Sequence, residues 1–127
     1  MTRDEILAKE PGRELDAAVA EEMGIYSFTT HDFFGNPHLS YFDDAPDGER
    51  NLYSVPHYST DISAAWPLFA ELPNANILHS DEGFAVEIWW MQDDVYQVQI
   101  ETEWCHTAPE AICKAYLLWR ESENDEG

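Results

Sequence analysis

The stretch from Tyr58 to Leu72 constrains the possible folds of this chain more than any other. It has the pattern of an amphipathic helix, with Ser59 or Thr60 as the expected N-cap. Asp61 is expected in the first turn, where its carboxylate meets the positive end of the helix dipole. Trp66 is large enough to anchor a core. The apolar residues that recur at helical spacing, and so are expected on one buried face, are Ile62, Ala65, Trp66, Phe69 and Leu72.

A proline interrupts this central helix. Pro67 lacks a backbone N–H and crowds the preceding turn, which predicts a kink near residues 63–66 or a helix start that is delayed toward them. Leu72-Pro73-Asn74 is expected to end the helix.

Two segments near the N-terminus also predict helical structure. Thr2-x-x-Glu5 has the form of a capping box before a short turn at 4–8. Residues 13–23 predict a longer helix that ends at Gly24, a favourable residue after a helix C-terminus. Its expected packing face comprises Leu15, Ala18, Val19, Glu22 and Met23, and its expected solvated carboxylates are Glu14, Asp16 and Glu21.

A closing helix is predicted from Thr107 to about Glu121. Thr107-Ala-Pro-Glu110 is a second capping-box arrangement, with Pro109 in the first turn. The residues expected to face inward are Ala111, Ile112, Ala115, Leu118 and Trp119. The polar segment 122–127 is expected to be a frayed acidic tail.

A β-hairpin is predicted between these helices. Residues 76–80 are predicted to form a strand, 81–83 a turn, and 84–91 and 95–104 two strands around Gln92-Asp-Asp94. Alternation puts the core face on Phe84, Val86, Ile88, Trp90, Tyr96, Val98, Ile100, Thr102 and Trp104. The opposite, outward face then carries the predicted partner-binding residues Glu87, Trp89, Gln97, Gln99, Glu101 and Glu103. The alternative is that Trp89 is packed under a helix or under the aromatic segment 25–58, since strand aromatics are usually packed.

Residues 25–58 are too aromatic for a disordered linker and are expected to be a long ordered excursion with one or two short strands, at 25–29 and 39–42. Residues 43–48 form a turn cluster. Long loops in compact domains are often functional, so this excursion could carry binding residues.

The predicted fold class is therefore α+β, an α/β sandwich in which about three helices pack on a mostly antiparallel sheet. The length of 127 residues fits a single domain, 1–127. The start of the sequence lacks a signal-peptide pattern, and two cysteines do not make a disulfide framework, which together predict a cytoplasmic location. No apolar run approaches the roughly 18 residues of a membrane span.

Charge limits the possible partners. Six Lys and Arg residues stand against 26 Asp and Glu residues, a net charge of −20. Such a chain is repelled by DNA, RNA and anionic membranes. The charge can serve solubility or a salty cytoplasm, it can attract a basic protein partner, or it can mimic a phosphate backbone on a nucleic-acid-binding surface.

Three segments in order resemble the phage ABA sandwich domain family. They are Pro11-Gly-Arg-Glu-Leu-Asp16, then Tyr58-Ser-Thr-Asp-Ile62 with Ala65-Trp66, then Thr107-Ala-Pro-Glu-Ala-Ile-Cys-Lys-Ala115 with Leu117. The resemblance implies a phage or prophage origin, a bacterial cytoplasm and an α/β sandwich, and it implies no activity. Pro67 departs from the uninterrupted helix of the family, and the polar hairpin face departs from a sheet covered on both sides by helices.

Reactive residue types do not form a catalytic or metal pattern in the sequence. Cys105-His106 and Cys113 lack the close ligand pairs of a zinc site, so a buried Cys113 and exposed histidines are expected. The neighbours Cys105 and His106 would point to opposite faces of a strand. No nucleotide-binding, hydrolase or metalloprotease motif is present. No catalytic residue, metal or cofactor is therefore predicted, and the sequence favours a non-enzymatic role over an enzymatic one.

The leading functional hypothesis is a small protein-binding module. Its more specific form is an inhibitor or DNA mimic that blocks a basic surface of a host defence or nucleic-acid enzyme. The competing hypothesis is a non-enzymatic module that binds or sequesters a ligand, with the aromatic segment 33–58 as a pocket wall. A third is an acidic structural phage protein whose charge serves solubility.

Overall fold

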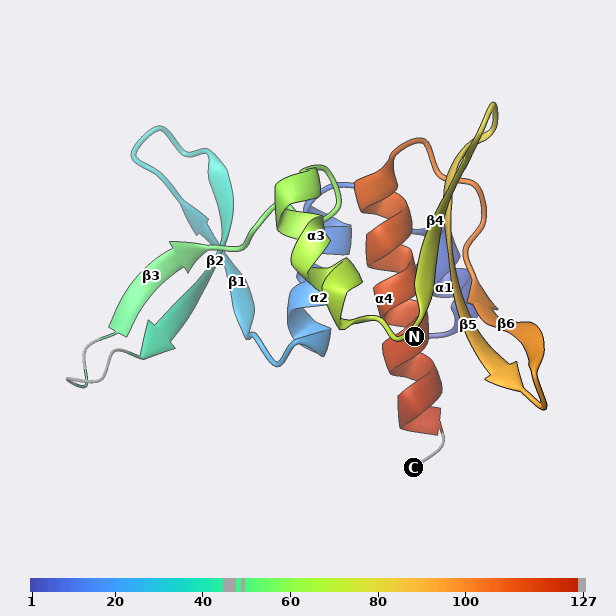
Figure 1. Cartoon of the computed structure of the whole chain (residues 1–127). Helices are drawn as coiled ribbons and strands as arrows, with labels where there is room; N and C mark the ends of the chain where they lie inside the picture. The colour runs from blue at the N-terminus through green and yellow to red at the C-terminus, as the bar shows by residue number, and fades with distance from the viewer. Residues whose placement is uncertain (45–47, 49, 126–127) are drawn as a thin grey trace.

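The computed structural model describes residues 1–44, 48 and 50–125. It contains four helices and two three-stranded antiparallel sheets (Figure 1). In chain order the elements are α1 (Arg3–Ala8), α2 (Arg13–Glu22), β1 (Ser27–His31), β2 (Pro37–Asp44), β3 (Arg50–Ser54), α3 (Ile62–Glu71), β4 (Ala75–Ser80), β5 (Gly83–Gln92), β6 (Val95–Glu101) and α4 (Ala108–Asp125). The predicted α+β class is confirmed.

The closing helix α4 is the centre of the fold. It contacts α1, α2, α3, β5 and β6, and in Figure 1 it lies between the helices α2 and α3 on one side and the β4-β5-β6 sheet on the other. Residues 110–118 of α4 are all buried, so its buried side chains lie on all sides of the helix, because each side meets a different element. The Thr107 hydroxyl accepts a hydrogen bond from the Glu110 N–H at 3.4 Å, which supports the predicted helix start. The predicted frayed tail from 122 is wrong as far as Asp125, because α4 continues to that residue; residues 126–127 lie outside the described part.

The helix predicted to be central, α3, lies at the side of the core. Asp61 is its N-cap and accepts a hydrogen bond from the Ser63 N–H at 3.0 Å, so the Ser59 or Thr60 cap is wrong. The predicted core anchor Trp66 is also wrong, because it is 53% exposed, whereas Leu68 is 1% exposed. α3 packs on α4 through Ala65 and Leu68, a face rotated from the one that the spacing of larger residues predicts. Ile62 accordingly lies exposed.

The strands form two sheets rather than one. The second, in the order β4-β5-β6, packs one face on α4 through Val86, Ile88 and Ile100, which matches the predicted hairpin. The first, in the order β1-β2-β3, projects from α2 on the far side of the helices (Figure 1). The strands expected at 25–29 and 39–42 correspond to β1 and β2, and β3 was not expected. We call this first sheet the wing. Three of the residues in the expected turn cluster, 45–47, lie outside the described part.

The N-terminal helices agree with the capping signals but not with every exposed position. Thr2 Oγ1 accepts from the Glu5 N–H at 3.2 Å at the start of α1. In α2, Leu15 and Val19 are buried as predicted. Asp16 was expected in solvent and is instead fully buried, because it pairs with groups from two distant segments.

Candidate functional site

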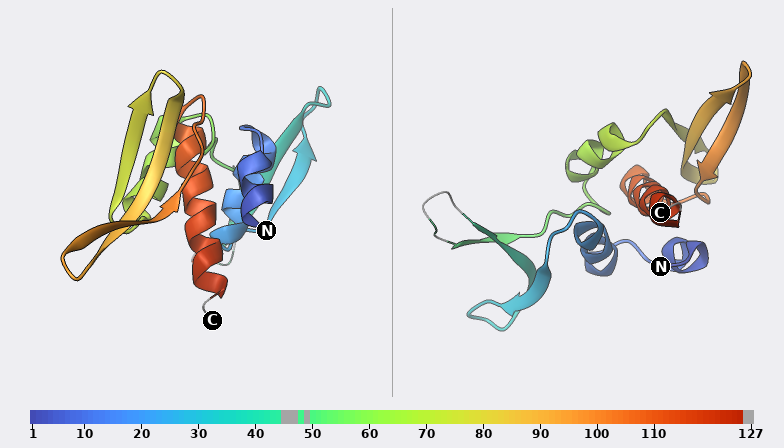
Figure 2. Two further views of the ribbon diagram at one scale, coloured as in Figure 1. Left: turned by 90° about the vertical axis from the view of Figure 1, so that its right-hand side faces the viewer. Right: turned by 90° about the horizontal axis from the view of Figure 1, so that it is seen from below.

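The outward face of the β4-β5-β6 sheet is the face on which the partner-binding residues were predicted. α4 covers the opposite face, and both views of Figure 2 show the outward face open. β5 and β6 also extend beyond β4, whose partners on β5 end at Ile88. Residues 89–92 and 95–98 therefore form a two-stranded ribbon at the end of the sheet.

A β-bulge changes which residues share this outward face. Ile88 pairs with Ile100, but Trp89 pairs with Val98, so Gln99 is an extra residue in β6. Directly opposed side chains of an antiparallel pair point to the same face, and one inserted residue reverses the alternation. Before the bulge, β6 therefore presents to the outward face the residues that alternation had assigned to the core.

The outward face is thus composed differently from the prediction. Glu87 and Glu101 are directly opposed on it, and Trp89 lies beside Val98. Gln97 is wrong as a member, because it pairs with Trp90 on the other face and accepts from the Trp90 indole N–H at 3.5 Å. Gln99 lies at the bulge.

One further predicted residue lies outside the sheet, and the prediction missed some members of the face. Glu103 is exposed beyond the end of β6. Tyr96 and Val98 belong to the outward face, and strand alternation alone assigned both to the core. Only the bulge would have identified them, and no glycine or proline in β6 marks it.

An aromatic pair organises the face. The Trp89 and Tyr96 rings lie with their centroids 5.3 Å apart. The Tyr96 hydroxyl donates a short hydrogen bond to Glu87 Oε1, and this bond raises the pKa of Tyr96 above its ordinary value. The Asn76 side-chain amide donates to the same oxygen at 3.1 Å. Glu87 is therefore fixed next to two aromatic rings, and Glu101 faces it across the strands.

The charge of this sheet is of one sign. From 51 to 113 the sequence contains no Lys or Arg, whereas the region of the sheet holds Asp81, Glu82, Glu87, Asp93, Asp94, Glu101 and Glu103. Arg3 reaches the edge of the sheet from α1, where its guanidinium donates to the Glu101 carbonyl oxygen at 2.8 Å. Like charges placed directly opposite one another, as at Glu87 and Glu101, destabilise a strand pair. A cation from another molecule would relieve that repulsion.

Cations elsewhere in the chain are engaged within the protein. Lys9 pairs with Glu14, Arg13 with Asp16, Lys114 with Glu110 and Arg120 with Glu22. Arg50 lies over the Phe42 ring at 6.0 Å. The excess of carboxylates is therefore not balanced from within the fold.

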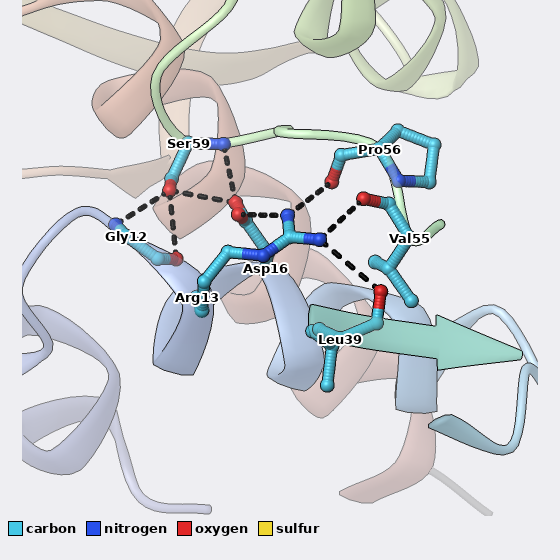
Figure 3. Close-up of polar contacts among 7 residues, drawn as sticks. All are labelled: Gly12, Arg13, Asp16, Leu39, Val55, Pro56 and Ser59. Carbon is cyan, nitrogen blue, oxygen red and sulfur yellow. Dashed lines mark hydrogen bonds and ion pairs between the residues drawn. The ribbon is translucent and has the colours of Figure 1, made fainter. Parts of the chain in front are cut away.

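A second cluster, centred on the buried residues Asp16 and Ser59, joins two of the three segments that carry the family resemblance (Figure 3). The Ser59 N–H and hydroxyl both donate to Asp16 Oδ1, at 2.8 and 2.7 Å, and the Gly12 N–H donates to Ser59 Oγ at 2.8 Å. Arg13 pairs with Asp16 Oδ2 at 2.9 Å. Two of the three segments that resemble the family motifs, 11–16 and 58–66, thus meet in one polar cluster.

The same arginine holds the base of the wing. The Arg13 guanidinium donates to the carbonyl oxygens of Leu39, Val55 and Pro56, at 3.3, 2.8 and 3.4 Å (Figure 3). The five contacts that Arg13 and Asp16 make to other segments are to backbone groups or to Ser59. The cluster therefore fixes the positions of those backbone segments relative to α2. Backbone carbonyl and amide groups at this junction are satisfied by side chains, as buried polar groups require.

The thiols and histidines lie apart. Burial raises the pKa of the Cys105 thiol to about 11 and also raises the pKa of Cys113, and both thiols are free. Cys113 is buried and the histidines are exposed, as predicted. Within residues 1–44, 48 and 50–125, no three His, Cys, Asp or Glu side chains gather as metal ligands.

Hollows near the aromatic segment are small. An apolar hollow of about 270 Å³ is lined by Met23, Pro56, Tyr58, Ala64, Pro67, Leu68 and Glu71, of which only Pro56 and Tyr58 belong to the segment 33–58. A hollow of about 310 Å³ on the wing is lined mainly by polar residues. Neither of these two hollows is an apolar pocket built from the aromatic residues of 33–58.

A comparison with protein families finds a match over most of the chain. The family model described as the phage ABA sandwich domain matches residues 17–117, most of the chain. The chain belongs to the phage ABA sandwich domain family. The match contains the segments at 58–66 and 107–117, and the segment at 11–16 directly precedes it. This phage ABA sandwich protein has no match among the curated proteins or the solved structures. Within its described residues, no helix is both long and apolar enough to cross a bilayer.

Proposed function

We propose that this phage ABA sandwich protein is a non-enzymatic protein-binding module that acts in the bacterial cytoplasm on a basic surface of a partner protein. The observation that carries the proposal is the opposed pair Glu87 and Glu101 beside the Trp89–Tyr96 rings, on an open sheet face without a lysine or arginine of its own. Inhibition of a host defence or nucleic-acid enzyme, by occupying its nucleic-acid site, is the finer form of the proposal.

Charge and aromatic content have separate roles in this interaction. A net charge of −20 accelerates encounter with a cationic surface and repels nucleic acid. Trp and Tyr are the residues most enriched at energetic centres of interfaces. An arginine of the partner placed between Glu87 and Glu101 could also stack on the Trp89 or Tyr96 ring.

The test compares two charge reversals of equal size. Glu101→Lys changes the proposed face, and Glu21→Lys changes an exposed position on α2 by the same amount. Partners are recovered from a bacterial lysate, identified and purified, and their association rates with each variant are measured at 0.1 M and 1 M salt. We expect Glu101→Lys to slow association at 0.1 M by about tenfold or more and Glu21→Lys to have a smaller effect, because the Debye length is only about 10 Å.

The Trp89→Ala variant tests the contribution of the aromatic ring to binding. Loss of a ring at an interface centre raises the dissociation rate more than it changes the association rate. Added DNA separates a DNA mimic from other binders, since a mimic and DNA compete for the same site. Equal recovery and equal rates for wild type, Glu101→Lys and Trp89→Ala would assign the charge to solubility and end the proposal.

A further inference from the structure

The loop between β1 and β2, at the outer end of the wing, exposes two aromatic rings. Phe33 is 97% exposed and Phe34 is 84% exposed, more than any other phenylalanine of the described chain. Their rings meet edge to face with centroids 5.6 Å apart. The wing extends away from the helices on the side opposite the β4-β5-β6 sheet (Figure 1), so this tip is separate from the face discussed above.

The tip is held in one conformation by Asp32. Its Oδ1 accepts from the backbone N–H groups of Phe34 and Asn36, at 2.8 and 2.9 Å. Its Oδ2 contacts His38 Nε2 at 3.1 Å and the Asn36 amide at 3.3 Å. The backbone closes the loop through Asp32 N–H to Asn36 O and Gly35 N–H to Asp32 O, both at 3.0 Å. Gly35 has the positive φ of 82° that the turn needs.

A rigid tip binds with a smaller entropic cost than a flexible one, because its conformation is already that of the complex. Two phenylalanine side chains can bury about 300–500 Å² together. A standard interface buries about 800 Å² on each partner. The pair is therefore large enough to be the centre of an interface and too small to be the whole of it.

We propose that Phe33 and Phe34 insert as a pair into an apolar pocket of a protein partner whose pocket is bordered by lysine or arginine side chains. The shape of the tip supports the apolar pocket of this proposal, since two projecting rings fit a concave apolar site. Charge complementarity supports the lysine or arginine border of the pocket, because Asp32 lies at the base of the rings in a chain of net charge −20.

The same charge argues against the other occupants of an exposed aromatic tip. Nucleic acid and anionic lipid are repelled by the chain. A second copy of the chain brings another −20. A small ligand would be left largely in solvent, because both rings project from the loop and are almost fully exposed. A cationic protein pocket satisfies both the apolar rings and the charge.

The test places a photo-cross-linker at the tip. The full chain with p-benzoylphenylalanine at position 33 is irradiated in a bacterial lysate, and the protein and peptide joined to it are identified by mass spectrometry. The identified protein is then purified, and its affinity is measured by calorimetry for wild type, Phe33→Ala, Phe34→Ala and Tyr26→Ala. Tyr26 is the matched control, because it is also 84% exposed but lies before β1, at the other end of the wing.

We expect the cross-linked peptide to line an apolar pocket bordered by cations. Phe33→Ala and Phe34→Ala should each weaken binding by about 30-fold, the effect of a residue at an interface centre, and Tyr26→Ala by less than about threefold. Circular dichroism should be unchanged, since both rings are in solvent.

Several results would overturn the inference. They are the absence of a protein adduct, equal affinity of the two phenylalanine variants and wild type, and a cross-linked peptide on a surface without lysine or arginine. Loss of self-association in sedimentation equilibrium, or loss of binding to phosphatidylcholine vesicles, on Phe33→Ala would assign the tip to a second copy or to a membrane. Glu101→Lys keeps its wild-type affinity here if the two proposed surfaces are independent, so the two proposals can fail separately.

Discussion

The Ser59 hydroxyl donates a hydrogen bond to Asp16 Oδ1 over 2.7 Å, and 43 positions of sequence separate the two residues. The bond joins α2 to the segment before α3 at a point where both residues are fully buried. Arg13 completes the cluster by pairing with Asp16 and by holding three carbonyl groups at the base of the wing. One buried carboxylate therefore ties together the helical core and the wing.

Asp16→Ala should destabilise the fold strongly. It leaves the buried Ser59 N–H without its acceptor, which costs about 1–3 kcal/mol. It also removes the carboxylate partner of Arg13, which keeps its three carbonyl acceptors. Urea denaturation followed by tryptophan fluorescence measures the change in the free energy of unfolding. Glu14→Ala is the control on the same helix, because the Glu14 side chain is exposed and its pair with Lys9 is worth about 1 kcal/mol or less. Similar losses for the two variants would contradict the cluster.

Leu68→Ala should cost about 2–5 kcal/mol and Trp66→Ala about 1 kcal/mol, although tryptophan is the larger side chain. Leu68 is enclosed by the core, whereas Trp66 is half-exposed and stacks on Phe69 with centroids 5.2 Å apart. Thermal melting of both variants decides the order. Acrylamide quenching supplies a second measurement, in which the Trp66→Phe variant loses a water-accessible part of the fluorescence.

Gly83→Ala should destabilise the second sheet. A Cβ at this position would lie 2.1 Å from the Cys105 carbonyl oxygen, and φ is +122°. The clash would break the paired hydrogen bonds between Phe84 and Cys105, so we expect about 3 kcal/mol from two lost bonds and backbone strain. Gly24→Ala has a positive φ of 81° but open space around the added Cβ, and it should cost only the strain, about 1–2 kcal/mol. An equal loss of stability in both would show that Cys105 is not adjacent.

Neither thiol should react quickly in the native protein. Burial raises the pKa of Cys105 to about 11, so about one thousandth of it is thiolate at pH 8, and Cys113 is shielded further. Ellman's reagent should label the native protein slowly and both cysteines rapidly in denaturant. Fast stoichiometric labelling of one native cysteine would contradict the burial of the pair.

Asp32 should titrate with a pKa of about 2, below its ordinary value of 3.8. The hydrogen bond from His38 is the main cause, followed by the backbone N–H of Asn36. Because the folded pKa is lowered, the loop contacts are complete above about pH 4 and are lost as the pH falls through about 2. Carbon-13 NMR between pH 6 and pH 3 should show little change at the Asp32 carboxyl.

His38→Ala should raise the Asp32 pKa toward 3.8, so the carboxyl signal should move within the same pH range. Asn36→Ala keeps the backbone donor and removes only a weaker side-chain contact, so its effect on the pKa should be smaller. A wild-type midpoint near 3.8 would contradict the hydrogen-bonded loop.

The sequence by itself determined the features that depend on near neighbours. The α+β class, the helix starts at Thr2 and Thr107, and the hairpin around Gln92-Asp-Asp94 all follow from caps, turns and short-range alternation. The family resemblance, which rests on short local segments, is confirmed by the family match over residues 17–117.

The tertiary structure decided which side of each element is buried. Spacing made Trp66 a core residue, but the shape of the contact with α4 selected Leu68 and left Trp66 outside. The inserted Gln99 exchanged Tyr96 for Gln97 on the outward face, since a single extra residue reverses a period of two. In the sequence Asp16 has no feature that distinguishes it from a surface carboxylate, whereas in the folded structure Ser59 and Arg13 bind it. Each of these outcomes depends on a partner that is distant in sequence, and local periodicity contains no information about that partner.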